Sequence, residues 1–236
     1  MAGCWLVVVV VRFAPVIQGR GATMILTVNK RNARFYPDLI RDMHRLRCRV
    51  FRDRLGWEVD VEDGEERDEF DKLDPVYLMA LDDHQELVGS WRLLPTTGPY
   101  MLKDTFPQLL DGQPAPTHPR LWECSRFSVD TPTGCTDGLA AINAITGELF
   151  HGMVEYCLAN GIDEIVTVYD LRVARILPRV GCRPSRTTSI QRVGITKALA
   201  GWFPISHGVL DDIAMATGIA EPVLVDALPT EIGQAA

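Results

Sequence analysis

Charged residues divide this 236-residue chain into an acidic stretch and a basic one. Asp53 to Asp74 contains eleven acidic and three basic residues, whereas Leu171 to Lys197 contains seven basic residues and no acidic one. Such charge runs are most often solvated surface. An acidic pocket can also hold a cationic ligand, and a basic face on an acidic protein can attract an acidic partner. The two stretches together favour two substrates of opposite charge.

Short motifs of polar and aromatic residues follow one another between residues 47 and 127. They are Arg47-Cys-Arg-Val-Phe51, Arg54-Leu-Gly-Trp57, Asp68-Glu-Phe-Asp71, Trp91-Arg92, Thr96-Thr-Gly-Pro-Tyr-Met101 and Trp122-Glu-Cys-Ser-Arg-Phe127. Arg47 and Phe51 lie one helical turn apart, and Trp57 follows the end of the same predicted helix. The ordered set resembles that of the acyl-homoserine lactone synthases, the autoinducer synthase family. The likeness covers most of residues 24–185.

The resemblance implies a fold and a reaction. The fold is α/β, a three-layer α/β/α sandwich around a central mixed and twisted sheet, similar to N-acetyltransferases, with an acyl channel where strands splay. The reaction transfers an acyl chain from acyl-acyl carrier protein to the amine of S-adenosylmethionine, closes a lactone and releases methylthioadenosine. The product is a quorum-sensing signal made in the bacterial cytoplasm. S-adenosylmethionine is a substrate, so neither a cofactor nor a metal is expected.

The resemblance also places the functional residues. Those expected to be catalytic are Arg47, Asp68, Asp71, Arg92, Glu123 and Arg126. Those expected to bind S-adenosylmethionine are Phe51, Trp57, Arg47, Asp71 and Arg126. The rings can face the sulfonium and the adenine. The two aspartates can balance the positive charge directly, or by holding Arg47 and Arg92 in place. Alternatively, the rings are core residues, Asp68 and Asp71 are loop caps, and Arg92 pairs with a carboxylate purely for structure.

Glu123 is the expected general base. The ammonium of S-adenosylmethionine must lose a proton before it attacks a thioester, and a partly buried carboxylate with a raised pKa can accept that proton through a water. Arg126 either holds the carboxylate of the ligand or orients Glu123. Strict alternation along a strand would put Glu123 and Ser125 on one face and Arg126 on the other, unless a bulge intervenes.

The acyl donor is expected to be a carrier protein. The strand over residues 121–129 is followed by Thr131-Pro-Thr-Gly-Cys-Thr-Asp-Gly138, which lacks the glycine-rich loop with which N-acetyltransferases bind the CoA pyrophosphate. Acyl-CoA is therefore the less favoured donor. Arg172, Arg175 and Arg179 are spaced three and four apart and share one helix face, where we expect the acidic carrier to dock.

The acyl chain requires an apolar tunnel. Its expected lining is Met101, Leu102, Phe106, Leu110, Ser125, Leu149, Met153, Thr167 and Tyr169. For each residue singly, ordinary core packing is the alternative. Family members that take 3-oxoacyl chains tend to have threonine where Tyr169 aligns, so Tyr169 argues against a 3-oxo preference. It either shortens the tunnel or donates a hydrogen bond to an oxygen of the chain.

Alternating strands and helices must position these residues. We expect strands over residues 25–28, 76–81, 87–94, 121–129, 164–168 and 189–193, and helices over 36–54, 102–110, 136–160, 171–180 and 210–217. Residues 58–74 are expected to form a polar loop. No linker divides the chain, so residues 24–236 are expected to form a single domain, with residues 1–23 as an extension outside its core.

Composition limits the partners. The net charge of −7 argues against nucleic acid binding. The six cysteines have no CxxC spacing, which leaves a zinc site or a disulfide framework unsupported. The apolar run from Cys4 to Val11 is too short to span a bilayer, and no membrane association is expected.

Two other functions stay open at this stage. One is a related N-acyltransferase that acts on another amine, which the combination of Trp57, Asp68 and Asp71 disfavours. The other is a ligand sensor without turnover, which the complete set of expected catalytic residues disfavours.

Overall fold

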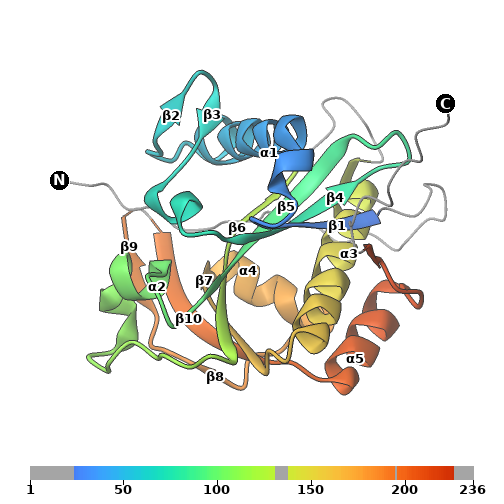
Figure 1. The fold of residues 1–236 in the computed structure, drawn as a ribbon. Helices are drawn as coiled ribbons and strands as arrows, with labels where there is room; N and C mark the ends of the chain where they lie inside the picture. Colours follow the sequence, from blue (N-terminus) through green and yellow to red (C-terminus); the bar gives the residue numbers. More distant parts are fainter. Residues whose placement is uncertain (1–23, 131–137, 195, 226–236) are drawn as a thin grey trace, which may run out of the picture.

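A nine-stranded sheet runs through the computed structural model, which describes residues 24–130, 138–194 and 196–225 (Figure 1). Its strands are β1 (Met24–Val28), β4 (Val76–Leu81), β5 (Leu87–Pro95), β6 (Leu121–Val129), β7 (Glu164–Asp170), β8 (Arg186–Thr187), β9 (Gln191–Val193), β10 (Thr196–Pro204) and β11 (Leu224–Val225). The strand order is β11-β1-β4-β5-β6-β7-β10-β8, and β9 pairs with β10. The β1–β11 and β6–β7 pairs are parallel and the others antiparallel, so the sheet is mixed, as expected.

Helices cover both faces of this sheet (Figure 1). The helix α1 (Pro37–Cys48) packs against Leu26 and Met79 on one face. The long helix α3 (Gly138–Ala159) packs against Ile25 and Leu78 on the other, and α4 (Leu171–Ile176) and α5 (His207–Thr217) lie on that side too. Neighbouring strand residues point to opposite faces, so each strand contributes to both layers of core. The three-layer α/β/α prediction is confirmed.

The predicted helix over residues 36–54 changes character part-way. It begins at Pro37, whose missing N–H costs nothing in a first turn. At Cys48 the α-helix ends, and the chain continues as the π-helical segment η2 (Arg49–Arg54). Such wide turns are rare and occur frequently at functional sites. Here the π-helical segment carries Phe51, and Gly56, with φ +67°, turns the chain away after it.

The acidic residues 58–74 are ordered, and the loop prediction was wrong there. The strands β2 (Val61–Glu62) and β3 (Glu65–Glu66) form a hairpin. Its two turn residues, Asp63 and Gly64, both have positive φ, as a type I′ hairpin turn requires. The 3₁₀ helix η3 (Glu69–Lys72) follows, with Asp68 as its N-cap. The Asp68 side chain accepts from two backbone N–H groups of η3, and Asp71 accepts from the backbone N–H of Asp68.

Other elements also differ from their predictions, among them two helices and a strand. The helix over 102–110 is split into α2 (Met101–Asp104) and the 3₁₀ turn η4 (Pro107–Leu110), because Pro107 cannot continue an α-helix. The helix over 171–180 is α4 followed by the 3₁₀ turn η5 (Leu177–Val180). The strand β10 was not predicted, because it is buried on both faces over most of its length and shows no alternation of polar and apolar residues.

The strands β6 and β7 part in the middle of the sheet. Their parallel pairing runs from Leu121 opposite Glu164 to Cys124 opposite Thr167 and then stops, although both strands continue. Beyond this point β6 pairs only with β5, and β7 only with β10. The expected splay is therefore present. No helix in the described part of the chain has the length and apolar character of a membrane span.

Candidate active site

Three arginines and three carboxylates form one buried ionic network beside the splay. Its members are Arg47 on α1, Arg92 on β5, Arg126 on β6, Glu66 on β3, and Asp68 and Asp71 at η3. Their formal charges sum to zero. Buried charges are tolerated when they are paired and hydrogen-bonded, and each member here meets at least two partners of opposite charge.

The aspartates hold the arginines in two-point contacts. Arg92 donates to both carboxylate oxygens of Asp68, at 2.5 and 3.0 Å. Arg47 does the same to Asp71, at 2.8 and 3.0 Å. Arg92 also reaches Asp71, at 2.9 Å, which links the two pairs. Paired contacts of this kind fix the plane of a guanidinium as well as its position. Asp68 and Asp71 thus contact Arg92 and Arg47 in the arrangement that the second of their two expected roles requires.

The ionisation of the network follows from this pairing. Burial disfavours charge on Asp71, but Arg47 and Arg92 outweigh it and hold the pKa of Asp71 far below its usual value. The pKa of Asp68 is lowered in the same way by Arg126 and Arg92. Burial acts against charge on Arg47 and Arg92 too, and the carboxylates raise both guanidinium pKa values despite it. All these groups are charged at neutral pH.

The sequence did not point to one member of the network, Glu66, or to two residues that contact the network, His44 and Tyr77. Glu66 is fully buried and bridges two arginines, with its oxygens 2.5 Å from Nε of Arg47 and 3.1 Å from Nε of Arg126. The backbone carbonyl of Glu66 lies 2.8 Å from Nδ1 of His44, and the hydroxyl of Tyr77 donates to Asp71 at 2.8 Å. In the sequence, Glu66 is one acidic residue among many. The Asp63-Gly64 pair is typical of a hairpin turn, and it was the signal that could have predicted a strand at Glu66.

Arg126 reaches this network through a bulge. Its backbone has φ +58°, a left-handed conformation that non-glycine residues rarely adopt, and the β5–β6 register shifts here. Arg92 lies opposite Ser125, and Ser90 opposite Ser128, which leaves one extra residue on β6. Arg126 therefore joins the face that carries Ser125. The alternation that would have separated it from Glu123 does not hold.

Glu123, on β6, is buried against the first residues of α2. Its two carboxylate oxygens accept the backbone N–H groups of Met101 and Leu102, at 2.8 and 2.7 Å. Burial raises the pKa of Glu123 to about 7, and these two hydrogen bonds, with Arg92 and Arg126 nearby, only partly oppose it. A carboxylate with this pKa is suited to exchange protons at neutral pH.

The two aromatic residues of the site cover one another. The rings of Phe51 and Trp57 are stacked, with their centroids 5.1 Å apart and their planes 2° from parallel. The guanidinium carbon of Arg126 lies 5.6 Å from the centre of the Phe51 ring. Both rings are buried. A ligand can therefore stack on the covered face of Phe51 only if Trp57 moves away.

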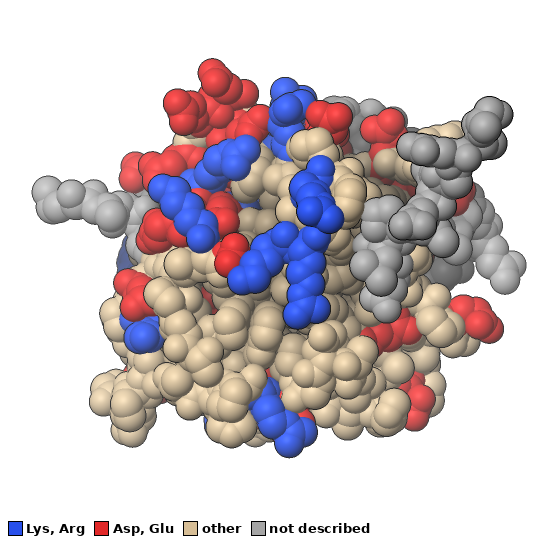
Figure 2. Space-filling model, viewed as in Figure 1, with Lys and Arg blue, Asp and Glu red and all other residues tan. Residues whose placement is uncertain are grey.

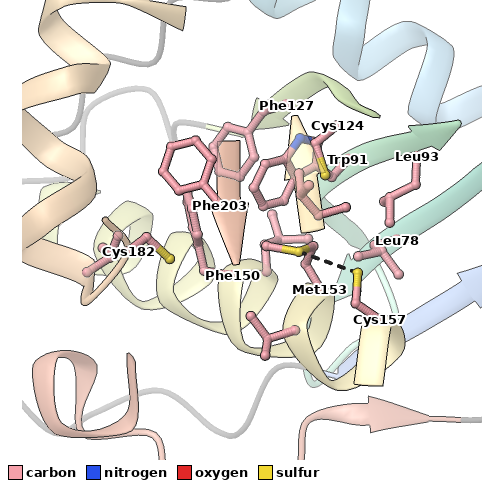
Figure 3. Packing of buried hydrophobic residues seen from close by; sticks show 14 of the residues in the cluster. Leu78, Trp91, Leu93, Cys124, Phe127, Phe150, Met153, Cys157, Cys182 and Phe203 are labelled. Carbon is pink, nitrogen blue, oxygen red and sulfur yellow. Dashed lines mark hydrogen bonds between the residues drawn. The ribbon is translucent and has the colours of Figure 1, made fainter. Parts of the chain in front are cut away.

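An apolar cavity lies on the α3 side of the sheet and reaches the splay. Its walls include Trp91, Phe127, Phe150 and Phe203, which converge in Figure 3. Its volume is about 60 Å³. Ser125 lines it as well, and the hydroxyl of Ser125 accepts from Nε of Arg92, at 3.1 Å. The cavity thus ends against the ionic network.

The expected acyl-chain residues fall into two groups. Ser125, Met153, Thr167 and Tyr169 line the cavity. Met101, Leu102, Phe106, Leu110 and Leu149 do not line it. The first four of these belong to a separate apolar cluster, because the hydrogen bonds of Glu123 to the backbone fix α2 there, and the sulfur of Met101 lies 3.3 Å from Arg92. Leu149 packs on Gly89 in the main core.

The basic residues Arg172, Arg175 and Arg179 are exposed on α4 and η5. In Figure 2, basic side chains gather near the centre of the face shown, and acidic side chains gather at its upper left, around β2 and β3.

The loop over residues 131–137, expected to lack a phosphate-binding glycine pattern, lies outside the described residues, as do residues 1–23.

Comparison with known proteins decides what this arrangement belongs to. A family model described as "Autoinducer synthase" matches residues 31–213. The chain belongs to the autoinducer synthase family. Among its relatives, a probable acyl-homoserine-lactone synthase of Sinorhizobium fredii is 43% identical over 180 residues, which are 76% of this chain and 86% of the relative. The acyl-homoserine-lactone synthase of Pseudomonas aeruginosa is 39% identical over 179 residues, 75% and 87% of the two chains.

Solved structures agree with this placement. The AHL synthase LasI superposes with a TM-score of 0.72 at 33% identity, over 86% of this chain and all of its own. A CoA-dependent acyl-homoserine lactone synthase, BjaI, determined with SAM and isopentyl-CoA, has a TM-score of 0.76 at 28% identity and covers 88% and 94%. A putative N-acetyltransferase from Lactobacillus plantarum shares the fold at 11% identity, with a TM-score of 0.52. As an autoinducer synthase, the protein is an acyl-transferring enzyme that makes a quorum-sensing signal.

Proposed function

We propose that this autoinducer synthase transfers an acyl chain from acyl-acyl carrier protein to the amine of S-adenosylmethionine, in the bacterial cytoplasm, and closes the homoserine lactone with release of methylthioadenosine. The observation that carries the proposal is the junction at Ser125. There an apolar cavity that suits an acyl tail meets an ionic network that suits a zwitterionic substrate. The structure of the relative BjaI with both SAM and isopentyl-CoA supports a site of this two-part kind.

Glu123 is the base in this proposal. Its ionised form takes a proton from the ammonium of S-adenosylmethionine, directly or through a water, and the free amine attacks the thioester carbonyl. The amide bond forms as the carbon–sulfur bond of the thioester breaks and the carrier thiol leaves. A base whose pKa is about 7 divides its population between proton acceptor and acid at neutral pH.

The ionic network orients the other end of the same substrate. The carboxylate of S-adenosylmethionine attacks the carbon beside the sulfonium, the carbon–sulfur bond breaks, and its electron pair goes to sulfur as methylthioadenosine leaves. The sulfonium is already a good leaving group, so this step depends mainly on position. Arg126 is suited to hold the carboxylate, because it lies at the edge of the network and keeps 8% of its side chain exposed. Phe51 and Trp57 supply the aromatic surface for the sulfonium and the adenine.

Turnover of labelled S-adenosylmethionine tests the proposal. The protein is incubated with an acyl-acyl carrier protein or with the matching acyl-CoA, and lactone and methylthioadenosine are quantified by mass spectrometry. We expect both products in equal amounts. Glu123→Gln should lower kcat at least about 100-fold, which is the usual scale for loss of a general base. The control is Glu86→Gln, an exposed carboxylate in the turn between β4 and β5. Acylation without methylthioadenosine, or no turnover with either donor, contradicts the proposal.

The choice of donor has its own test. An acidic carrier protein would meet the exposed Arg172, Arg175 and Arg179, and pairing of this kind acts mainly on association and weakens with salt. Arg172→Glu with Arg175→Glu should lower kcat/KM for acyl-acyl carrier protein at least tenfold and leave acyl-CoA turnover nearly unchanged. Arg31→Glu with Arg34→Glu, at two other exposed arginines, provides a control with the same charge change. Equal losses with both donors would show that these arginines do not recognise the carrier.

A further inference from the structure

Tyr169 lies flat along the floor of the apolar cavity. It is on β7, on the same face as Ile165 and Thr167, and it is 3% exposed. Its ring leans over β10 towards Phe203, with the two ring centroids 5.9 Å apart. The residue opposite Tyr169 on β10 is Leu199. The ring does not project straight out from the sheet but leans along β10, so that it lies over the next residue of that strand on the same face.

Gly201 makes this arrangement possible. It is opposite Thr167 on β10, directly beneath the ring. A Cβ at this position would lie 2.8 Å from Cε1 and 3.0 Å from Cζ of Tyr169, and closer still to the hydroxyl. Such contacts are shorter than carbon atoms tolerate, and both the ring and the strand backbone are packed. The tyrosine therefore occupies the volume that the side chain of residue 201 would fill in an ordinary strand.

The position of this ring limits the space for an acyl tail. The cavity volume of about 60 Å³ is well under the roughly 150 Å³ of an engineered apolar cavity that holds benzene. Across from Tyr169 stand Phe150 and Met153 of α3, which are packed in the main core. Building on the proposed acyl transfer, we propose that Tyr169 seated on Gly201 is the determinant of acyl-chain length in this enzyme, and that the height of its ring above β10 sets where the chain must stop.

The proposal fixes the direction of three substitutions. Tyr169→Ala removes the floor of the cavity and should admit longer chains. Gly201→Ala lifts the ring into the cavity and should admit only shorter ones. In Tyr169→Ala there is no ring to lift, so adding Gly201→Ala should change little. Tyr169→Phe keeps the ring and should keep the length preference of the wild type.

The test is a competition among donors in one tube. Each variant receives S-adenosylmethionine and an equimolar mixture of butanoyl, hexanoyl, octanoyl, decanoyl and dodecanoyl groups on acyl carrier protein, and then the same mixture on CoA. The lactones are quantified by mass spectrometry. Ratios between products do not depend on how much of a variant is folded, so a partly unstable variant still reports its preference.

We expect the ratio of longer to shorter lactones to rise at least tenfold in Tyr169→Ala and to fall at least tenfold in Gly201→Ala, since one methylene in an apolar pocket changes kcat/KM by about tenfold or more. Unchanged ratios in Tyr169→Ala overturn the proposal. So does an effect of Gly201→Ala that is as large without the tyrosine as with it. Absence of any lactone from the wild type would instead refute the proposed acyl transfer itself, so the two failures are distinguishable.

Discussion

Arg92 and Asp68 form a two-point ion pair, with 2.5 Å from Nη1 to Oδ1 and 3.0 Å from Nη2 to Oδ2, and no part of the Arg92 side chain is exposed. Asp68 is also the N-cap of η3. One carboxylate therefore orders the acidic segment and orients an arginine of the site. The order of that segment and the charge of the site depend on the same pair.

Breaking this pair should destabilise the protein strongly. Arg92→Met leaves Asp68 and Asp71 buried with one cation fewer, and removing one partner of a buried pair typically costs about 3–5 kcal/mol. Urea unfolding followed by circular dichroism would measure the loss. The control is Lys30→Met, because the Lys30–Asp74 pair, at 3.0 Å, is also an ion pair but is exposed on both sides, and we expect a loss of at most about 1 kcal/mol there. Equal losses at the two sites would contradict the assignment.

The pH dependence of catalysis should follow Glu123. Its pKa of about 7 means that the proton-accepting form is scarce at pH 6 and predominant at pH 8. The kcat/KM should therefore rise with pH with a midpoint near 7 and level off above about pH 8, and Glu123→Asp should shift that midpoint while Glu123→Gln removes the rise. A rise that persists unchanged in Glu123→Gln would assign the titration to another group.

The same carboxyl should leave a signature in stability. Burial raises its pKa from 4.5 to about 7, so between these values the folded protein binds the proton and the unfolded chain does not. The free energy of unfolding contributed by Glu123 must then fall as pH rises through this window. From pH 4.5 to pH 7.5, the melting temperature of the wild type should therefore fall relative to that of Glu123→Gln. A constant difference across the window would show that the pKa is not raised.

Two threonines in the cavity wall should respond in opposite ways to the same substitution. The hydroxyl of Thr146 is buried and has no hydrogen-bond partner in the described part of the chain, whereas that of Thr167 donates to the carbonyl of Cys124 at 2.9 Å. Replacing a buried unpaired hydroxyl by a methyl group is neutral to stabilising, and removing a donor from a buried carbonyl costs about 1 kcal/mol. We expect Thr146→Val to raise the melting temperature and Thr167→Val to lower it. A drop for Thr146→Val would reveal a partner for its hydroxyl.

The cysteines should be unreactive in the folded protein. Burial raises the pKa of Cys124 well above its usual value and that of Cys182 to about 12, and it also raises the pKa of Cys157 and Cys48. Only the thiolate reacts. In a variant that carries Cys4→Ser and Cys135→Ser, we expect no reaction with a disulfide reagent at pH 8 until urea unfolds the chain, and then four equivalents. Fast labelling before unfolding would contradict this.

Much of the fold was predictable because its signals are local. The strands containing Leu78, Leu93 and Phe127, and a helix over the region of α1, follow from short apolar patterns. The strand β10 was not predictable in this way, because burial on both faces erases the alternation that marks a strand. The 3₁₀ helix η3 was missed because a capping box of two aspartates resembles any acidic loop.

The residues of the site were likewise only partly predictable from the sequence. The arginines and aspartates were found through the resemblance, and their grouping in space agrees with it. Glu66 was not found, because its role depends on two arginines that are 19 and 60 positions away along the chain. Met101 and Phe106 were assigned to the acyl tunnel from their apolar character alone. Which face of the sheet they occupy is decided by the backbone contacts of Glu123, and no local pattern encodes that.

The bulge at Arg126 has a consequence for how β6 can change. One extra residue puts the two halves of this strand out of phase, so that Cys124 and Phe127 both face α3 although they are three positions apart. Deleting Arg126 would restore regular alternation and leave Glu123 and Phe127 on their present sides of the sheet, whereas a deletion elsewhere in β6 would turn the side chains on one side of it to the opposite face. The bulge is thus a place where β6 can lose a residue without reorienting the rest of the strand, and the residue lost would be an arginine of the ionic network.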